Sequence, residues 1–174
     1  LLHQFFSPIS NKRNDLYGGN LENRSRFLIN ISKKLHKVCI NKNIILGARI
    51  TGKDWLKGGI QIKDSIYLVN KLKEIGLDYV CVSSGGIKTI TNLNAKSKYN
   101  INIAKKIKSE TSILTRVAGN LKNISQANSV LKKNKADLVA FARPYLKNPN
   151  FLFYNSSMDN KQDIPKPYLR GFKV

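Results

Sequence analysis

Short apolar segments alternate with helix-forming segments along most of the chain, and this alternation restricts the fold more than any other feature. The predicted strands cover residues 44–50, 78–84, 112–119 and 136–142. The predicted helices cover residues 21–35, 64–74, 100–110 and 125–133. Because the strands are apolar at nearly every position, both faces of the sheet are expected to be buried. The pattern predicts an α/β protein built on a parallel sheet.

Helix boundaries are marked by residues that suit the ends of helices. Asn20 and Ser125 are predicted to cap the first and fourth helices, since short polar side chains accept hydrogen bonds from free amides there. Gly76 follows the second helix, where a left-handed residue commonly ends a helix. The segment RPYLKNPNF (143–151) is predicted to open one last helical turn.

Small or polar residues follow three of the four predicted strands, in the sequences TGKD, SSGG and AGN. Both a doubly wound sheet and a (β/α)₈ barrel place their ligands at the carboxyl ends of parallel strands. The alternation of strands and helices does not distinguish these two architectures. It does predict a ligand site at this edge of the sheet.

The charge of the chain is strongly positive, with 31 Lys and Arg against 10 Asp and Glu and a formal net charge of +21. Such a balance is typical of nucleic-acid binding. However, the lysines are scattered over every predicted helix, and no zinc-ligand spacing or RNA-binding motif accompanies them. We therefore interpret them as solvated surface charge and predict no nucleic-acid partner.

Two further classes are disfavoured by simple counts. Cys39 and Cys81 form neither a disulfide framework nor a metal cluster, so no metal and a reducing cytoplasm are expected. No apolar run approaches the roughly 20 residues of a membrane span, so no membrane partner is expected.

The opening segment LLHQFFSPISNKRNDLYGGNLENRSRF (1–27) closely resembles a segment of the Old Yellow Enzyme family of FMN-dependent oxidoreductases. The likeness continues through ARITGKDWLKGG, DYVCVSSGG, ADLVAFARPYLKNP and KPYLRGF. The resemblance implies a TIM (β/α)₈ barrel, of which this chain supplies the C-terminal half, strands five to eight. Residues 1–155 would form a partial FMN-binding barrel and residues 156–174 an extended tail. The missing N-terminal half-barrel would carry the family's substrate-binding histidine pair.

The resemblance also implies site residues. Arg49 matches the family arginine at the pyrimidine edge of the flavin, where a guanidinium stabilises the negative charge of the reduced ring. Ala118 and Gly119 after the seventh strand, with Ala142 and Arg143 after the eighth, match the phosphate-binding corners. Most relatives have Gly-Arg where this chain has Ala142-Arg143, and the methyl group is compatible with a negative φ.

Arg170 matches an arginine that, in one branch of the family, reaches into the active site of a neighbouring subunit. This match implies a homo-oligomer, and the alternative is a disordered basic tail.

Other conspicuous residues are given structural roles at this point. His3 is interpreted as a packing residue and His36 as a surface residue. The Ser-Ser-Gly-Gly loop (83–86) is explained equally well by a tight turn or by ligand contact. Trp55 is interpreted as an aromatic anchor for its loop.

The function implied by the resemblance is an FMN-dependent NAD(P)H oxidoreductase that reduces the activated C=C bond of α,β-unsaturated carbonyl compounds. One alternative is a flavin reductase or hydroxylase acting on acyl-CoA or aromatic thioesters. Another is an inactive half-barrel remnant, and a third is a basic nucleic-acid-binding protein. The 174 residues alone are expected neither to hold FMN tightly nor to reduce enones.

Overall fold

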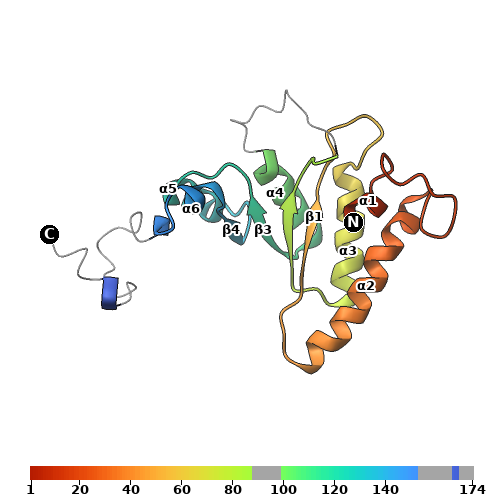
Figure 1. The fold of residues 1–174 in the computed structure, drawn as a ribbon, viewed down its shortest axis with the longest axis horizontal. Coiled ribbons are helices and arrows are strands. Elements are labelled where there is room, and N and C mark those ends of the chain that lie inside the picture. The colour runs from red at the N-terminus through yellow and green to blue at the C-terminus, as the bar shows by residue number, and fades with distance from the viewer. Residues whose placement is uncertain (88–98, 153–165, 169–174) are drawn as a thin grey trace.

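A computed structural model of the chain describes residues 1–87, 99–152 and 166–168 (Figure 1). Its elements are, in chain order, α1 (Leu2–Phe6), α2 (Leu21–Asn41), β1 (Gly47–Thr51), α3 (Ile62–Ile75), β2 (Tyr79–Ser83), α4 (Tyr99–Thr111), β3 (Leu114–Ala118), α5 (Ile124–Lys132), β4 (Leu138–Ala140) and α6 (Arg143–Lys147). The predicted alternation of helices and strands is confirmed.

The strands form one four-stranded sheet in the order β1-β2-β3-β4, and every pair is parallel. The predicted α/β class with a parallel sheet is therefore confirmed. The strands are shorter than predicted, most clearly at the start of β1. Ile44 and Ile45 precede the strand and are 53% and 74% exposed, so their apolar character does not come from burial in the sheet.

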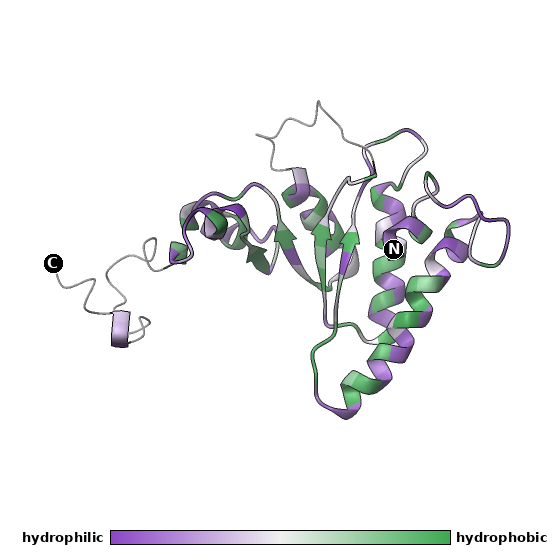
Figure 2. Ribbon diagram, in the orientation of Figure 1, coloured by the Kyte–Doolittle hydropathy of each residue, from purple (hydrophilic) through white to green (hydrophobic). Residues whose placement is uncertain are grey.

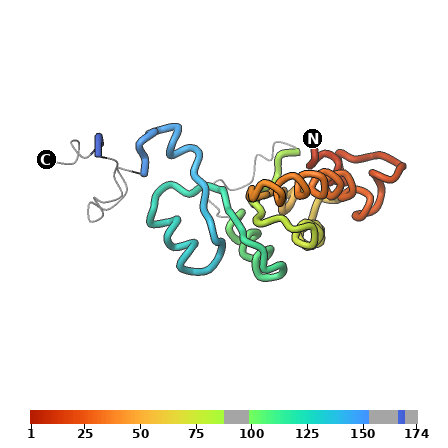
Figure 3. Tube along the Cα trace, turned by 90° about the horizontal axis from the view of Figure 1, so that it is seen from below, coloured from red at the N-terminus to blue at the C-terminus, as the bar shows by residue number. Residues whose placement is uncertain are grey.

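The row of residues that faces the helices forms the core. Ile50, Val82 and Val117 are neighbours in register and are between 0 and 4% exposed. Leu68 and Leu72 of α3 and Ile107 of α4 belong to the same core. Figure 3 shows α3, α4 and α5 following one another from the N-terminal toward the C-terminal part of the molecule, and Figure 2 shows both polar and apolar turns on α2 and α3.

The opposite face of the sheet carries the alternate residues, because successive side chains of a strand point to opposite faces. Arg49, Cys81 and Arg116 form one row of neighbours across β1, β2 and β3. This face would be the inner wall if the sheet were continued into a barrel.

The helix caps agree with the sequence in two cases out of three. The side chain of Asn20 accepts the Asn23 amide at 2.9 Å, and Gly76 ends α3 with φ of 104°. The prediction that Ser125 caps the fourth helix is wrong. Asn123 is the cap, because its side chain accepts the amide of Gln126 at 2.9 Å, and α5 therefore begins at Ile124.

No helix within residues 1–87, 99–152 and 166–168 combines the length and apolar character needed to cross a membrane. Over the same residues, no group of His, Cys, Asp or Glu side chains is arranged to hold a metal ion.

Candidate functional site

A hollow of about 360 Å³ lies at the carboxyl ends of β1 and β2 and contains Arg49. Its wall is formed by Leu2, His3, Phe6, Leu28, Arg49, Ile50, Thr51, Leu68 and residues 83–86. Arg49 is exposed, and the part of the chain that the structure describes offers its guanidinium no ion pair or hydrogen-bond partner. A cation held at a strand end without an acidic partner is suited to bind an anionic ligand.

Backbone and hydroxyl contacts join the loops after β1 and β2. The Gly52 amide donates to the carbonyl oxygen of Ser83 at 2.7 Å, and the Ser83 hydroxyl donates to the carbonyl oxygen of Ile50 at 3.0 Å. Gly85 and Gly86 have φ of 72° and 100°, a conformation that glycine adopts without strain. The Ser-Ser-Gly-Gly loop thus has a definite structural role, and it also lines the hollow beside Arg49.

Asn100 joins the loop after β2 to the corner after β3. Its Oδ1 accepts the Ser84 hydroxyl at 2.6 Å, and its Nδ2 donates to the carbonyl oxygen of Ala118 at 2.8 Å. A Cβ on Gly119 would lie 2.9 Å from Nδ2 of Asn100, so the small residue at this corner is required by packing. In the sequence, Asn100 is simply the first residue of the predicted helix 100–110. Its position next to a polar loop and a helix start was the only signal.

The two predicted phosphate corners lie on neighbouring strands. Ala118 of β3 and Ala140 of β4 are partners in register, so Gly119 and the pair Ala142-Arg143 follow adjacent carboxyl ends. Ala142 has a negative φ of −126°, which accommodates its methyl group. Arg143 is exposed at the start of α6 and has no acidic partner among the described residues. These corners are not part of the hollow around Arg49.

The interpretation of His3 as a packing residue is wrong. Both ring nitrogens make hydrogen bonds, Nε2 with Asp54 at 3.0 Å and Nδ1 with Thr51 at 2.9 Å. The partners are separated from His3 by about fifty positions, so no local pattern in the sequence could reveal the contact.

Arg116 is a second cation on the inner row that sequence reasoning missed. Its guanidinium carbon lies 5.7 Å from the centre of the Tyr79 ring, and the neighbouring Cys81 thiol, its partner in register on β2, raises the pKa of Arg116. The signal was available, because an arginine inside an apolar strand is unusual.

Trp55 behaves as the sequence interpretation expects of a loop anchor. Its ring makes an edge contact with Tyr99 at 5.5 Å, and the amine of Lys53 lies 4.9 Å from its ring centre. Arg170, the predicted inter-subunit residue, lies outside the described residues.

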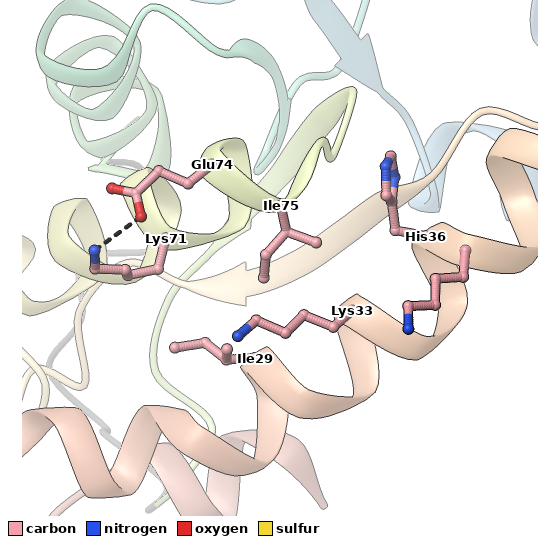
Figure 4. A pocket seen from close by; sticks show the side chains of 7 residues that line it. Ile29, Lys33, His36, Lys71, Glu74 and Ile75 are labelled. Atoms are coloured by element: carbon pink, nitrogen blue, oxygen red, sulfur yellow. Dashed lines mark hydrogen bonds and ion pairs between the residues drawn. The ribbon is translucent and has the colours of Figure 1, made fainter.

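A second hollow, of about 540 Å³, lies between α2 and α3 (Figure 4). It is lined by lysines, His36, Glu74 and two isoleucines, and Lys71 pairs with Glu74 at 2.8 Å. His36 packs here against Gly76, whose missing Cβ leaves room for the ring. This hollow is formed by the helices alone and is remote from the strand ends.

The fold and these strand-end features define a class of protein: a parallel α/β protein with cationic and glycine-containing corners at the carboxyl ends of its strands, the edge where such folds place their ligands. The model of the NADH:flavin oxidoreductase / NADH oxidase family matches residues 1–161, and the chain belongs to this family. The predicted resemblance to Old Yellow Enzyme proteins is thereby confirmed. At the level of the family, so is the prediction of FMN with NAD(P)H as reductant.

Similar proteins include two bacterial NADPH dehydrogenases. The one from Clostridium acetobutylicum is 36% identical over 174 residues, which cover 99% of this chain and 50% of that protein. The one from Bacillus subtilis is 33% identical over 174 residues, again 99% of this chain and 50% of that protein. The chain therefore spans about half the length of the curated relatives it matches.

Solved structures give the same picture of the fold. Morphinone reductase is 26% identical with a TM-score of 0.63, over 87% of this chain and 39% of that chain. A 2-naphthoyl-CoA reductase complex is 24% identical with a TM-score of 0.79, over 87% of this chain and 24% of that chain. The assignment of the four strands as five to eight, the boundary at residue 155 and the roles of the site residues stay predictions.

Proposed function

We propose that this chain is the C-terminal half, strands five to eight, of an FMN-dependent NAD(P)H oxidoreductase that reduces the activated C=C bond of α,β-unsaturated carbonyl compounds. Residues 1–155 would form its part of the barrel and residues 156–174 a tail that brings Arg170 to a neighbouring subunit. The enzyme would act in the cytoplasm. The observation that carries the proposal is Arg49, an exposed cation without an acidic partner in residues 1–87, 99–152 and 166–168, which lies in a hollow at the strand ends of a flavin-family chain.

The residues present fit a flavin nucleotide. In the described part of the chain, the guanidinium groups of Arg49 and Arg143 have no acidic partner. Each is therefore free to bind a negatively charged group of a ligand. Among the described residues, no heavy atom lies within 4 Å of a Cβ built on Gly86, which lines the hollow beside Arg49. Arg49 would bind the pyrimidine edge, and Arg143 with the backbone of residues 118–119 and 142 would bind the phosphate.

When bound, FMN supplies the hydride chemistry between NAD(P)H and the substrate. Arg49 would stabilise negative charge on the cofactor, which a cation held in place does without reorganisation. The hydrogen bonds between Ser83 and the backbone of Ile50 and Gly52 hold the end of β1 in place. They therefore also hold the backbone of Arg49, which belongs to the same strand. Residues of the N-terminal half-barrel would polarise the substrate carbonyl.

One observation favours a second candidate, an inactive half-barrel. The chain covers half of its curated relatives, and among the described strands β1 and β4 each have one neighbour, which leaves two open sheet edges. Open parallel edges favour self-association. An inactive half-barrel predicts no FMN binding when a matching first half is supplied.

The test completes the barrel by joining the chain to the N-terminal half of the Clostridium acetobutylicum NADPH dehydrogenase. The purified protein should show FMN absorbance and reduce an enone at the expense of NADPH, whereas the 174 residues alone should do neither. Arg143→Ala should lose FMN, and Lys147→Ala, on the same short helix, should keep it. A completed and folded barrel without FMN would overturn the proposal.

A further inference from the structure

A single imidazole joins three segments at the edge of the candidate site. His3 lies on α1, Thr51 is the last residue of β1, and Asp54 lies in the loop that follows. The ring bonds Thr51 Oγ1 through Nδ1 at 2.9 Å and Asp54 Oδ1 through Nε2 at 3.0 Å. The strand end that carries Arg49 is therefore attached to α1 by side chains alone.

Asp54 fixes the direction of these hydrogen bonds. Its side chain is 0% exposed, and its Oδ2 accepts the Ser7 hydroxyl at 2.7 Å and the Ile60 amide at 2.8 Å. Burial alone would raise the pKa of Asp54, but hydrogen bonds from His3, Ser7 and Ile60 outweigh it, and the pKa lies below the usual range. A carboxylate only accepts, so Nε2 of His3 carries a proton.

The other ring nitrogen completes a directed chain. In the neutral ring with a proton on Nε2, Nδ1 has a free lone pair and accepts from the Thr51 hydroxyl. Donation then runs from Thr51 to His3 and from His3 to Asp54. In this arrangement both ring nitrogens of His3 are hydrogen-bonded, and the ring connects Thr51 to Asp54.

His3 and Thr51 also line the hollow that contains Arg49. Arg49 and Thr51 stand two residues apart on β1 and therefore on the same face of the sheet. We propose that His3 is a positioning residue for Arg49: by donating from Nε2 to Asp54 while accepting from Thr51, it fixes the strand end on which the guanidinium stands. The inference deepens the proposed flavin site and rests on that function for the ligand.

Substituting His3 by glutamine or by asparagine tests its two hydrogen bonds separately. The terminal nitrogen of glutamine takes the place of Nε2 and can donate to Asp54, whereas the amide of asparagine takes the place of Nδ1 and reaches only Thr51. Leucine makes neither bond. Because Thr51 is joined to Asp54 only when both bonds are made, His3→Gln and His3→Asn should each loosen the end of β1, and His3→Leu should loosen it most.

The first measurement is amide hydrogen exchange by NMR on the full 174-residue chain. The Gly52 amide, bonded to Ser83 at the end of β1, should exchange roughly tenfold faster in His3→Leu, the factor for one hydrogen bond to a charged group. In His3→Gln and His3→Asn, which each keep one of the two bonds, the Gly52 amide should exchange faster than in the wild type by a smaller factor, about threefold. The Val117 amide in the buried middle of β3 reports global opening, so the effect is read as the ratio of the two rates.

The second measurement is the FMN dissociation constant of the completed barrel. This constant should rise about tenfold in His3→Leu and about threefold in His3→Gln and His3→Asn. Failure of the wild-type barrel to bind FMN would refute the proposed function, and the exchange ratios would still decide the role of His3. The role is refuted if His3→Leu keeps the wild-type exchange ratio, or if the Gln and Asn variants both keep it. Where His3→Leu does not fold, the exchange ratios of His3→Gln and His3→Asn against the wild type give the decision.

Discussion

The side chain of Asn100 donates a hydrogen bond of 2.8 Å to the carbonyl oxygen of Ala118, and this contact sets the geometry of the corner after β3. The same amide accepts the Ser84 hydroxyl, so one buried residue at the start of α4 connects the loops that follow two neighbouring strands. Asn100 is 8% exposed, which leaves its partners with little access to water. The arrangement of the candidate phosphate corner therefore depends on a residue outside it.

Asn100→Ala should destabilise the chain. The carbonyl oxygen of Ala118 and the hydroxyl of Ser84 lose their partner, and a buried unsatisfied polar group costs about 1–3 kcal/mol. Urea unfolding measures the change in the free energy of unfolding. Asn30→Ala, at an exposed position in the middle of α2, is the control and should stay within about 0.5 kcal/mol of the wild type. Equal stability of Asn100→Ala and the control would contradict the structural role of this amide.

Gly119→Ala should lower the free energy of unfolding more than Gly86→Ala. Both positions have a positive φ that penalises a side chain, 158° and 100° respectively. A Cβ at Gly119 would also lie 2.9 Å from Nδ2 of Asn100, whereas nothing lies within 4 Å of one at Gly86. The added crowding should cost a further 1–3 kcal/mol or so, the range for overpacking. Urea unfolding of the two variants compares them directly, and equal losses would show that Asn100 moves freely out of the way.

The sequence was sufficient to predict what local chemistry controls. Apolar runs predicted the parallel strands, Asn20 and Gly76 predicted helix ends, and the family motif indicated Arg49 and Arg143. Three contacts could not be predicted in this way. These contacts are His3 with Asp54, Ser84 with Asn100, and Arg116 with the Tyr79 ring, and each joins residues that are distant in the chain.

The reason is physical. A periodic apolar pattern reports which face of an element is buried, because burial acts on every residue of that face. A hydrogen bond between two side chains needs both atoms within about 3 Å, which depends on the packing of whole elements. The same limit applies to a local feature, the cap of α5. Both Asn123 and Ser125 have side chains that are able to cap a helix, and Asn123 is the cap because α5 begins at Ile124.

Asp54→Asn should remove part of the acid sensitivity of the fold. The folded-state pKa of Asp54 lies below its usual value, so its stabilising effect is present above the unfolded pKa of about 4 and is lost as pH falls through the folded pKa. The difference in unfolding free energy between the wild type and Asp54→Asn should therefore be largest near neutral pH and shrink below about pH 4.

Urea unfolding at a series of pH values checks this difference. Glu110→Gln removes an exposed ion pair with Lys106 and should change stability by less than about 1 kcal/mol at any pH. If the advantage of the wild type over Asp54→Asn stayed constant down to pH 2, Asp54 would not be the ionised acceptor of the network.

Arg49→Ala in the completed barrel should slow flavin reduction by NADPH more than it weakens FMN binding. Arg143 and the strand corners would still hold the phosphate, so occupancy should fall only in part. The lost cation would act mainly where negative charge develops, and removing one such group costs roughly 100-fold or more in rate.

Stopped-flow absorbance of the flavin measures the rate, with occupancy taken from the same spectra. Arg49→Lys, which keeps the charge without the planar fork, should fall between the two, and Arg26→Ala on the outside of α2 should match the wild type. A full rate of reduction in Arg49→Ala would exclude this role, because the only exposed cation in the hollow among the described residues would then be dispensable.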